Sequence, residues 1–143
     1  MAEILHQLTV RATRQKLFQA VSTPAGLDAW WTKRSSGEAV EGSEYELFFS
    51  SEYDWRAVVS KSLPDSMFEL KITDSHDDWL GTVVGFSLRG DGGVTQVRFH
   101  HRGWRETNEH FRVSSYCWAI YLRLLKRYVE LGEVIAYEDR LDA

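Results

Sequence analysis

The segment 108–131 brings hydroxyl, aromatic and thiol side chains onto one face of an expected helix. Its charged residues fall on the opposite side at helical spacing. The inward side carries an apolar stripe with polar groups at its centre: Phe111, Ser114, Cys117, Trp118, Tyr121, Leu125 and Tyr128. A helix that seals a dry core favours Leu, Ile and Val at such positions, whereas inward hydroxyls fit the wall of a ligand cavity. A core helix whose hydroxyls bond to the backbone is the equal alternative.

A histidine and a tyrosine that face one cavity could share general acid–base chemistry. In the expected strand 94–101, Val97, Phe99 and His101 alternate on one face, while the other face is polar. We therefore expect His101 to point inward, near the mouth of the cavity. The commoner role of a lone inward histidine is that of a hydrogen-bonded core residue. The functional alternative makes His101 and Tyr121 polar anchors for a ligand oxygen.

Patterns for metal, nucleophilic and phosphate chemistry are missing from the sequence. His100 and His101 are adjacent on a strand, so they point to opposite faces and cannot share a metal ion. Neither a helical HExxH pair nor a GxSxG elbow occurs, and the lone Cys117 is expected to be a protonated core thiol. The glycine-rich stretch 90–93 joins two strands and does not open a helix. We therefore predict no catalytic residue, no metal and no cofactor, and we expect a binding protein rather than an enzyme.

Length and charge place the chain among soluble globular proteins. Its 143 residues suit one domain, 1–143, and 43% hydrophobic with 27% charged residues allow a packed core. The net charge of −4 comes without a basic stripe, which argues against a nucleic-acid partner. No apolar run is long enough to span a bilayer, and the start Met1-Ala2-Glu3-Ile4 lacks signal-peptide features. With only one cysteine, these features favour a cytoplasmic location.

The periodicity of apolar residues changes along the chain from strand to helix, then to strands and back to helix. The expected strands are 3–10, 44–49, 55–61, 67–73, 82–89 and 94–101, and the expected helices are 14–21, 25–31 and 108–131. Thr13 and Thr23-Pro24 are helix-start signals, and Gly132 is a helix-stop signal. Gly103 is expected to break the last strand. Turn residues at 63–66, 74–78 and 90–93 separate the strands.

This order predicts an α+β fold in which a curved antiparallel sheet wraps around the long C-terminal helix. Sequential strands joined by short turns form an antiparallel meander, and only the helix 108–131 is large enough to cover its apolar face. Two short helices follow the first strand. Adjacent helical residues diverge, so at most one of Trp30 and Trp31 is expected to face the cavity, and the other is a candidate for exposure at a partner surface. The tail 133–143 is expected to pack on the sheet or on a second copy, and either a monomer or a homodimer fits.

Side-chain alternation along these elements selects the candidate cavity residues. The ligand-binding candidates are the inward aromatic and polar side chains: Trp31, Phe49, Trp55, Phe86, Phe99, His101, Ser114, Trp118 and Tyr121. An apolar or aromatic small molecule is the partner that these residue types favour.

Several short motifs resemble the Aha-type branch of the START, or SRPBCC, superfamily, which is related to activators of the heat-shock protein ninety ATPase. The motifs are Leu8-Thr9-Val10-Arg11-Ala12-Thr13, Leu17-Phe18, Ala29-Trp30-Trp31, His100-His101-Arg102-Gly103-Trp104, Ser115-Tyr116-Cys117-Trp118 and Leu122-Arg123-Leu124-Leu125. The resemblance covers nearly the whole chain. It implies the helix-grip fold, which is also that of the birch-pollen allergen, with an apolar cavity between sheet and helix.

Three functions remain open at this point. The first is a carrier or sensor of an apolar or aromatic small molecule. The second is an enzyme, a cyclase or hydratase on a polyketide-like substrate, which would use His101, Ser114 and Tyr121. The third, motivated by the resemblance alone, is a chaperone ATPase modulator; activators of the eukaryotic type carry a separate N-terminal domain for which 143 residues leave no room.

Overall fold

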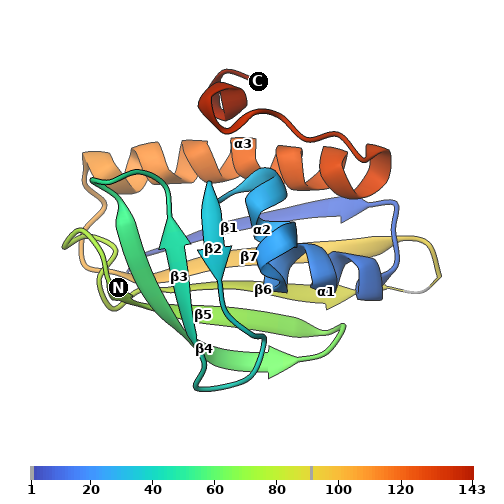
Figure 1. The fold of residues 1–143 in the computed structure, drawn as a ribbon, viewed down its shortest axis with the longest axis horizontal. Coiled ribbons are helices and arrows are strands. Elements are labelled where there is room, and N and C mark those ends of the chain that lie inside the picture. Colours follow the sequence, from blue (N-terminus) through green and yellow to red (C-terminus); the bar gives the residue numbers. More distant parts are fainter. Residues whose placement is uncertain (1, 91) are drawn as a thin grey trace.

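A computed structural model describes residues 2–90 and 92–143 of the chain (Figure 1). Its elements in chain order are β1 (Ala2–Val10), α1 (Arg14–Ser22), α2 (Pro24–Trp30), β2 (Arg34–Ser36), β3 (Glu44–Phe48), β4 (Asp54–Leu63), β5 (Met67–Asp74), β6 (Val83–Arg89), β7 (Thr95–Trp104), α3 (Glu109–Leu131) and the 3-10 helix η1 (Tyr137–Asp142). Two residues named in the sequence arguments, Met1 at the start and Asp91 in the turn 90–93, lie outside the described residues.

The strands form one antiparallel sheet in the order β1-β7-β6-β5-β4-β3-β2. The sheet curves, and α3 crosses its concave side (Figure 1). Among the strands of the described residues, only β1 and β7 pair although they are distant in sequence. The predicted α+β fold, a curved sheet around a long C-terminal helix with two short helices after β1, is confirmed.

The helix boundaries follow from capping side chains. Thr13 and Thr23 accept backbone N–H bonds at the starts of α1 and α2, and Asn108 accepts a bond of 3.0 Å from the Phe111 N–H at the start of α3. Gly132 ends α3 with a φ of 70°, a left-handed conformation that glycine adopts without a steric penalty. No helix among the described residues is long and apolar enough to cross a membrane.

The last strand is longer than the sequence predicted, because Gly103 does not break it. Glu3 pairs with Arg102 and Ala2 pairs with Trp104, so Gly103 is the extra residue of a β-bulge. Its φ of 90° suits a glycine, and the bulge lets β7 continue to Trp104.

Both tryptophans at the end of α2 are buried, so the expected exposure of one of them is wrong. Trp30 is 0% exposed and Trp31 is 2% exposed. Their rings lie 6.2 Å apart with an interplanar angle of 25°, and the Trp30 indole N–H donates to the Ala20 carbonyl at 3.0 Å. The C-terminal tail explains part of this burial, because it folds back over α3 (Figure 1) and bonds to residues at the end of α2 rather than packing on the sheet.

Candidate functional site

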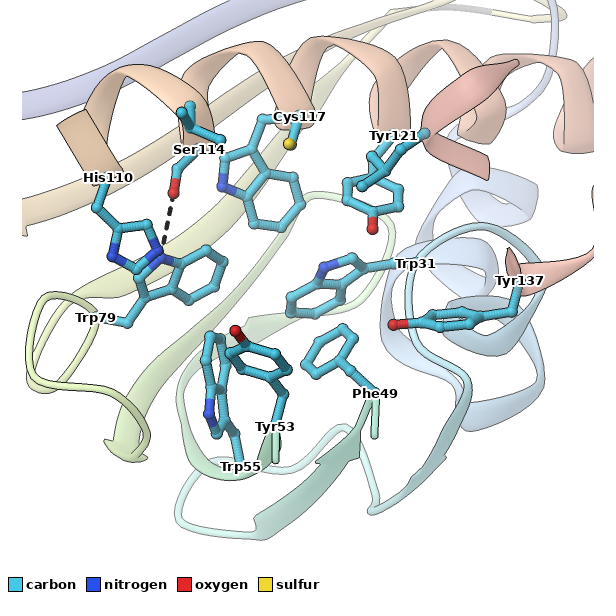
Figure 2. Close-up of a pocket in the computed structure, with 13 residues that line it drawn as sticks. Trp31, Phe49, Tyr53, Trp55, Trp79, His110, Ser114, Cys117, Tyr121 and Tyr137 are labelled. Atoms are coloured by element: carbon cyan, nitrogen blue, oxygen red, sulfur yellow. Dashed lines mark hydrogen bonds between the residues drawn. The ribbon is translucent and has the colours of Figure 1, made fainter. Parts of the chain in front are cut away.

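A pocket of about 320 Å³ opens between α3 and the sheet, a volume at the lower end of that of small-molecule sites. Figure 2 shows side chains from both layers pointing into it. The pocket is lined by Trp31, Phe49, Tyr53, Trp55, Trp79, His110, Val113, Ser114, Cys117, Trp118, Tyr121, Tyr137 and Leu141. Within the described part of the chain, no Lys, Arg, Asp or Glu side chain is among the lining residues.

Five separate segments contribute these walls. Trp31 follows α2; residues 49, 53 and 55 come from the β3–β4 hairpin; Trp79 comes from the β5–β6 connection. One face of α3 supplies the six lining residues from His110 to Tyr121, and η1 supplies Tyr137 and Leu141. The pocket therefore exists only when the sheet, the helix α3 and the tail are assembled.

The walls are a continuous aromatic network. The ring of Trp118 lies 5.1 Å from Trp31 and 5.9 Å from Trp79, and the second pair is stacked with an interplanar angle of 24°. Trp55 lies 4.8 Å from Trp79, and Phe49 lies 5.5 Å from Trp31. Large rings in mutual contact have few alternative rotamers, so the shape of these walls is fixed by their own packing.

Hydroxyl groups supply most of the polarity inside the pocket. The oxygens of Tyr53, Tyr121 and Tyr137 lie around it (Figure 2). Burial raises the pKa of Tyr121 to about 12, so its hydroxyl is neutral near pH 7. The hydroxyl of Ser114 accepts a bond of 3.3 Å from the Trp79 indole N–H. Neutral donors and acceptors of this kind orient a ligand without attracting a charge.

His110 adds an oriented imidazole to the pocket. Its Nδ1 lies 3.0 Å from a carboxylate oxygen of Asp78, and the Asn108 amide donates to the other oxygen at 3.2 Å. Hydrogen bonds from His110 and Asn108 lower the pKa of Asp78, so this carboxylate is an acceptor. Nδ1 therefore carries a proton, which leaves Nε2 as an acceptor in the neutral ring.

His101 is inward-facing as predicted, but it lies beneath the pocket instead of at its mouth and is 0% exposed. Thr82 donates its hydroxyl to the Trp79 carbonyl, so the His101 Nε2–H, 2.8 Å away, donates to Thr82. Nδ1 accepts a bond of 3.1 Å from the Trp118 indole N–H. Both ring nitrogens are thus engaged, and burial lowers the pKa of His101 to about 3, which describes a neutral core histidine.

Most candidates selected by alternation meet in one place. Of these, Trp31, Phe49, Trp55, Ser114, Trp118 and Tyr121 line the pocket. Phe86, Phe99 and His101 lie in the core below it, where Phe99 contacts the Trp118 ring at 4.5 Å and Phe86 contacts Phe99 at 5.4 Å. Alternation gives the inward face of a strand, but it does not say how deep along that face a cavity begins.

The sequence arguments missed several lining residues. His110 lies four residues before Ser114, Val113 four residues before Cys117, and Cys117 four residues before Tyr121, so helical spacing was a usable signal for them. Cys117 is half-buried at the pocket and not a core residue, and burial raises the pKa of its thiol. Tyr53 and Trp79 lie in connections without periodicity, and Tyr137 and Leu141 lie in the tail. No group of three His, Cys, Asp or Glu suited to a metal ion occurs in the residues that the structure describes.

Comparisons with known proteins agree with this architecture. A family model described as Activator of Hsp90 ATPase homolog 1-like protein matches residues 11–130. The solution structure of the Aha1 dimer from Colwellia psychrerythraea is 31% identical, with a TM-score of 0.84 over 93% of this chain and 99% of that chain. The crystal structure of CalU16 from Micromonospora echinospora shares the fold at 16% identity, with a TM-score of 0.73 over 98% of this chain and 84% of that chain. A search of curated proteins finds no match. Residues 11–130 cover most of the sequence, and the chain therefore belongs to the Activator of Hsp90 ATPase homolog 1-like protein family.

Proposed function

We propose that this protein binds an uncharged, largely aromatic small molecule between α3 and the sheet. The observation that carries the proposal is the composition of the pocket walls: four tryptophans and further aromatic rings around about 320 Å³. Burial of apolar ligand surface against such walls contributes about 25 cal/mol per Å². A charged ligand would lose its hydration there without gaining an opposite charge, which disfavours carboxylates and phosphates.

The polar groups of the pocket favour a ligand that carries a hydroxyl group. In the neutral ring, the Nε2 of His110 is an acceptor, because the Nδ1–H donates to Asp78. A phenol-type hydroxyl donates to such a nitrogen, and its oxygen can accept from a tyrosine hydroxyl such as that of Tyr121. These bonds give orientation, and the aromatic area gives affinity.

Binding is better supported than catalysis by the same groups. His101, the base that a cyclase or hydratase would need, already has both nitrogens bonded, and burial lowers its pKa to about 3. The Ser114 hydroxyl accepts a bond from an indole, and the structure places no base within hydrogen-bonding distance of it among the described residues. A general base must reach the proton that it abstracts and titrate near the working pH.

A fluorescence titration with N-phenyl-1-naphthylamine, an uncharged aromatic dye, tests the proposal. The variant Cys117→Phe places a ring into the pocket from α3, and the control Ala119→Phe places the same ring on an exposed position of that helix. We expect saturable binding to the wild type and to Ala119→Phe, and affinity at least tenfold lower for Cys117→Phe. Equal affinities in all three proteins, or no binding to any of them, would count against a binding pocket.

A second candidate function, modulation of the Hsp90 ATPase, is favoured by the family membership and by the 31% identity to Aha1. The test is the ATP hydrolysis rate of Hsp90 with and without the purified protein. An unchanged rate at saturating protein would remove this candidate.

A further inference from the structure

One wall of the pocket comes from the C-terminal 3-10 helix η1, and this helix contains a buried arginine. Arg140 is 4% exposed, although arginine is rarely buried without a paired charge. Tyr137 and Leu141, on either side of it in sequence, line the pocket. In contrast, Glu138 and Asp139 are exposed, so η1 has an outer acidic face and an inner face that covers the pocket.

The guanidinium of Arg140 is bonded only to backbone carbonyls among the described residues. It donates to Ile135 at 3.0 Å, to Thr32 at 3.1 Å and to Asp28 at 2.7 Å. The carbonyl of Asp28 belongs to the last turn of α2, where carbonyls have no partner within the helix. Meanwhile the carboxylate of Asp28 is occupied, because it accepts the hydroxyls of Thr32 at 2.6 Å and Ser35 at 2.8 Å.

These bonds couple two walls of the pocket. Asp28 and Thr32 flank Trp31, which faces the pocket, and the same guanidinium bonds to both residues. On the other side, the guanidinium carbon lies 5.4 Å from the centre of the Tyr137 ring. Arg140 therefore fixes the distance between the Trp31 wall and the η1 wall. Figure 2 shows that the Tyr137 side chain, which comes from the C-terminal tail, lies on the side of Trp31 and Phe49 that is away from Trp79.

We propose that Arg140 holds η1 as a closing wall and thereby limits the size of the molecule that the pocket admits. The inference rests on the proposed function, because it names how the same pocket is restricted. Its physical basis is that a 3-10 helix of only six residues has little stability of its own. With Arg140 removed, η1 opens locally at low cost, while the sheet and α3 keep their contacts.

The lone thiol provides a measurement that needs no knowledge of the ligand. Cys117 lines the pocket, and it is the only cysteine in the sequence. We would measure its alkylation rate with N-ethylmaleimide and with the much larger N-(1-pyrenyl)maleimide. The ratio of the two rates cancels any change in thiol pKa and reports pocket width. We expect Arg140→Ala to raise the rate of the large reagent relative to the small one at least fivefold. In the same variant, amide hydrogen exchange of residues 137–142 should accelerate.

Two further variants complete the test. Arg123→Ala removes an exposed arginine from α3 and should leave the ratio unchanged. Leu141→Ala shortens a lining side chain of η1 but keeps the hydrogen bonds of Arg140. It should therefore raise the ratio of the two alkylation rates without accelerating amide hydrogen exchange at Arg140. This variant also tests the closing wall if Arg140→Ala does not fold. An unchanged ratio in Arg140→Ala, whether or not η1 exchanges faster, would overturn the proposal. If the ratio rises while the wild type binds no naphthylamine dye, the closing wall stands and the proposed function fails.

Discussion

At the scale of single residues, His101 shows how burial decides between a catalytic and a structural histidine. Its ring donates to Thr82 and accepts from Trp118, so protonation would break the bond from Trp118 and place a charge in the core. The Trp118 indole is thereby held in one orientation at the back of the pocket. His101 is not among the lining residues, so its part in the proposed binding is to position this wall.

The lowered pKa of His101 predicts acid sensitivity. Its pKa falls from 6.5 to about 3 on folding, so the unfolded chain takes up the proton first as the pH falls. The contribution of His101 to the free energy of unfolding is fully present above pH 6.5. It decreases by about 1.4 kcal/mol per pH unit between pH 6.5 and pH 3. The variant His101→Gln keeps one donor and one acceptor but does not titrate.

We therefore expect the free energy of unfolding of the wild type, relative to His101→Gln, to decrease by about 2 kcal/mol from pH 7 to pH 5. Urea unfolding at both pH values measures it. His100 is present in both proteins and cancels. If the wild type and His101→Gln lost the same free energy of unfolding between pH 7 and pH 5, His101 would not be buried as a neutral ring.

At the scale of elements, the outer face of the sheet depends on a glycine between two long polar side chains. Gly85 pairs with Glu69 on one side and with His100 on the other. Since Gly85 has no side chain, Glu69 and His100 meet above it at 2.7 Å, and Ser60 donates to the same carboxylate at 2.8 Å. Both residues of the pair are buried although they lie on the face opposite α3.

The substitution Gly85→Ala should therefore destabilise β5–β6–β7. A Cβ at this position would lie 2.4 Å from the His100 ring, so the ring must leave and the buried Glu69 loses its partner. Overpacking and a broken buried pair predict a loss of about 2 kcal/mol or more in urea unfolding.

Gly93→Ala is the matched control, because nothing lies within 4 Å of a Cβ there, and its effect should stay within about 0.5 kcal/mol. In a His100→Ala background, Gly85→Ala should cost far less than in the wild type, which a double-mutant cycle measures. Equal costs in both backgrounds would mean that the clash with His100 is not the cause.

At the scale of the whole molecule, five segments must meet before the pocket exists, so a bound ligand touches residues that are far apart in sequence. The six tryptophans divide into two groups. Trp31, Trp55, Trp79 and Trp118 line the pocket, whereas Trp30 and Trp104 are buried outside its lining.

This division predicts the pattern of an NMR titration. With N-phenyl-1-naphthylamine added, the indole N–H signals of the four lining tryptophans should shift in a saturable way. The signals of Trp30 and Trp104 should shift least, because their rings do not face the ligand. Uniform shifts of all six indoles, or shifts centred on Trp104, would place the ligand elsewhere.

Apart from the short elements β2 and η1, the amino-acid sequence by itself determined the order of the strands and helices, the helix starts at Thr13 and Thr23, and the inward face of each long strand. These features depend on local capping chemistry and on periods of two and 3.6 residues, which are visible in one dimension. The fold class followed, because a meander with one apolar face needs one long helix to cover it.

Only the tertiary structure decided which inward residues face open space. Phe99 and His101 obey the same alternation as Trp55, yet they lie below the pocket, because the Trp118 ring lies against Phe99 and the Trp79 ring lies against His101. Phe86 also lies below the pocket, in contact with the rings of Phe99 and Trp30. The bulge at Gly103 and the anchoring of η1 by Arg140 depend on partners that are 100 or more positions distant in sequence. Contacts over such separations leave no local pattern, so cavity depth and closure appear only when the chain has folded.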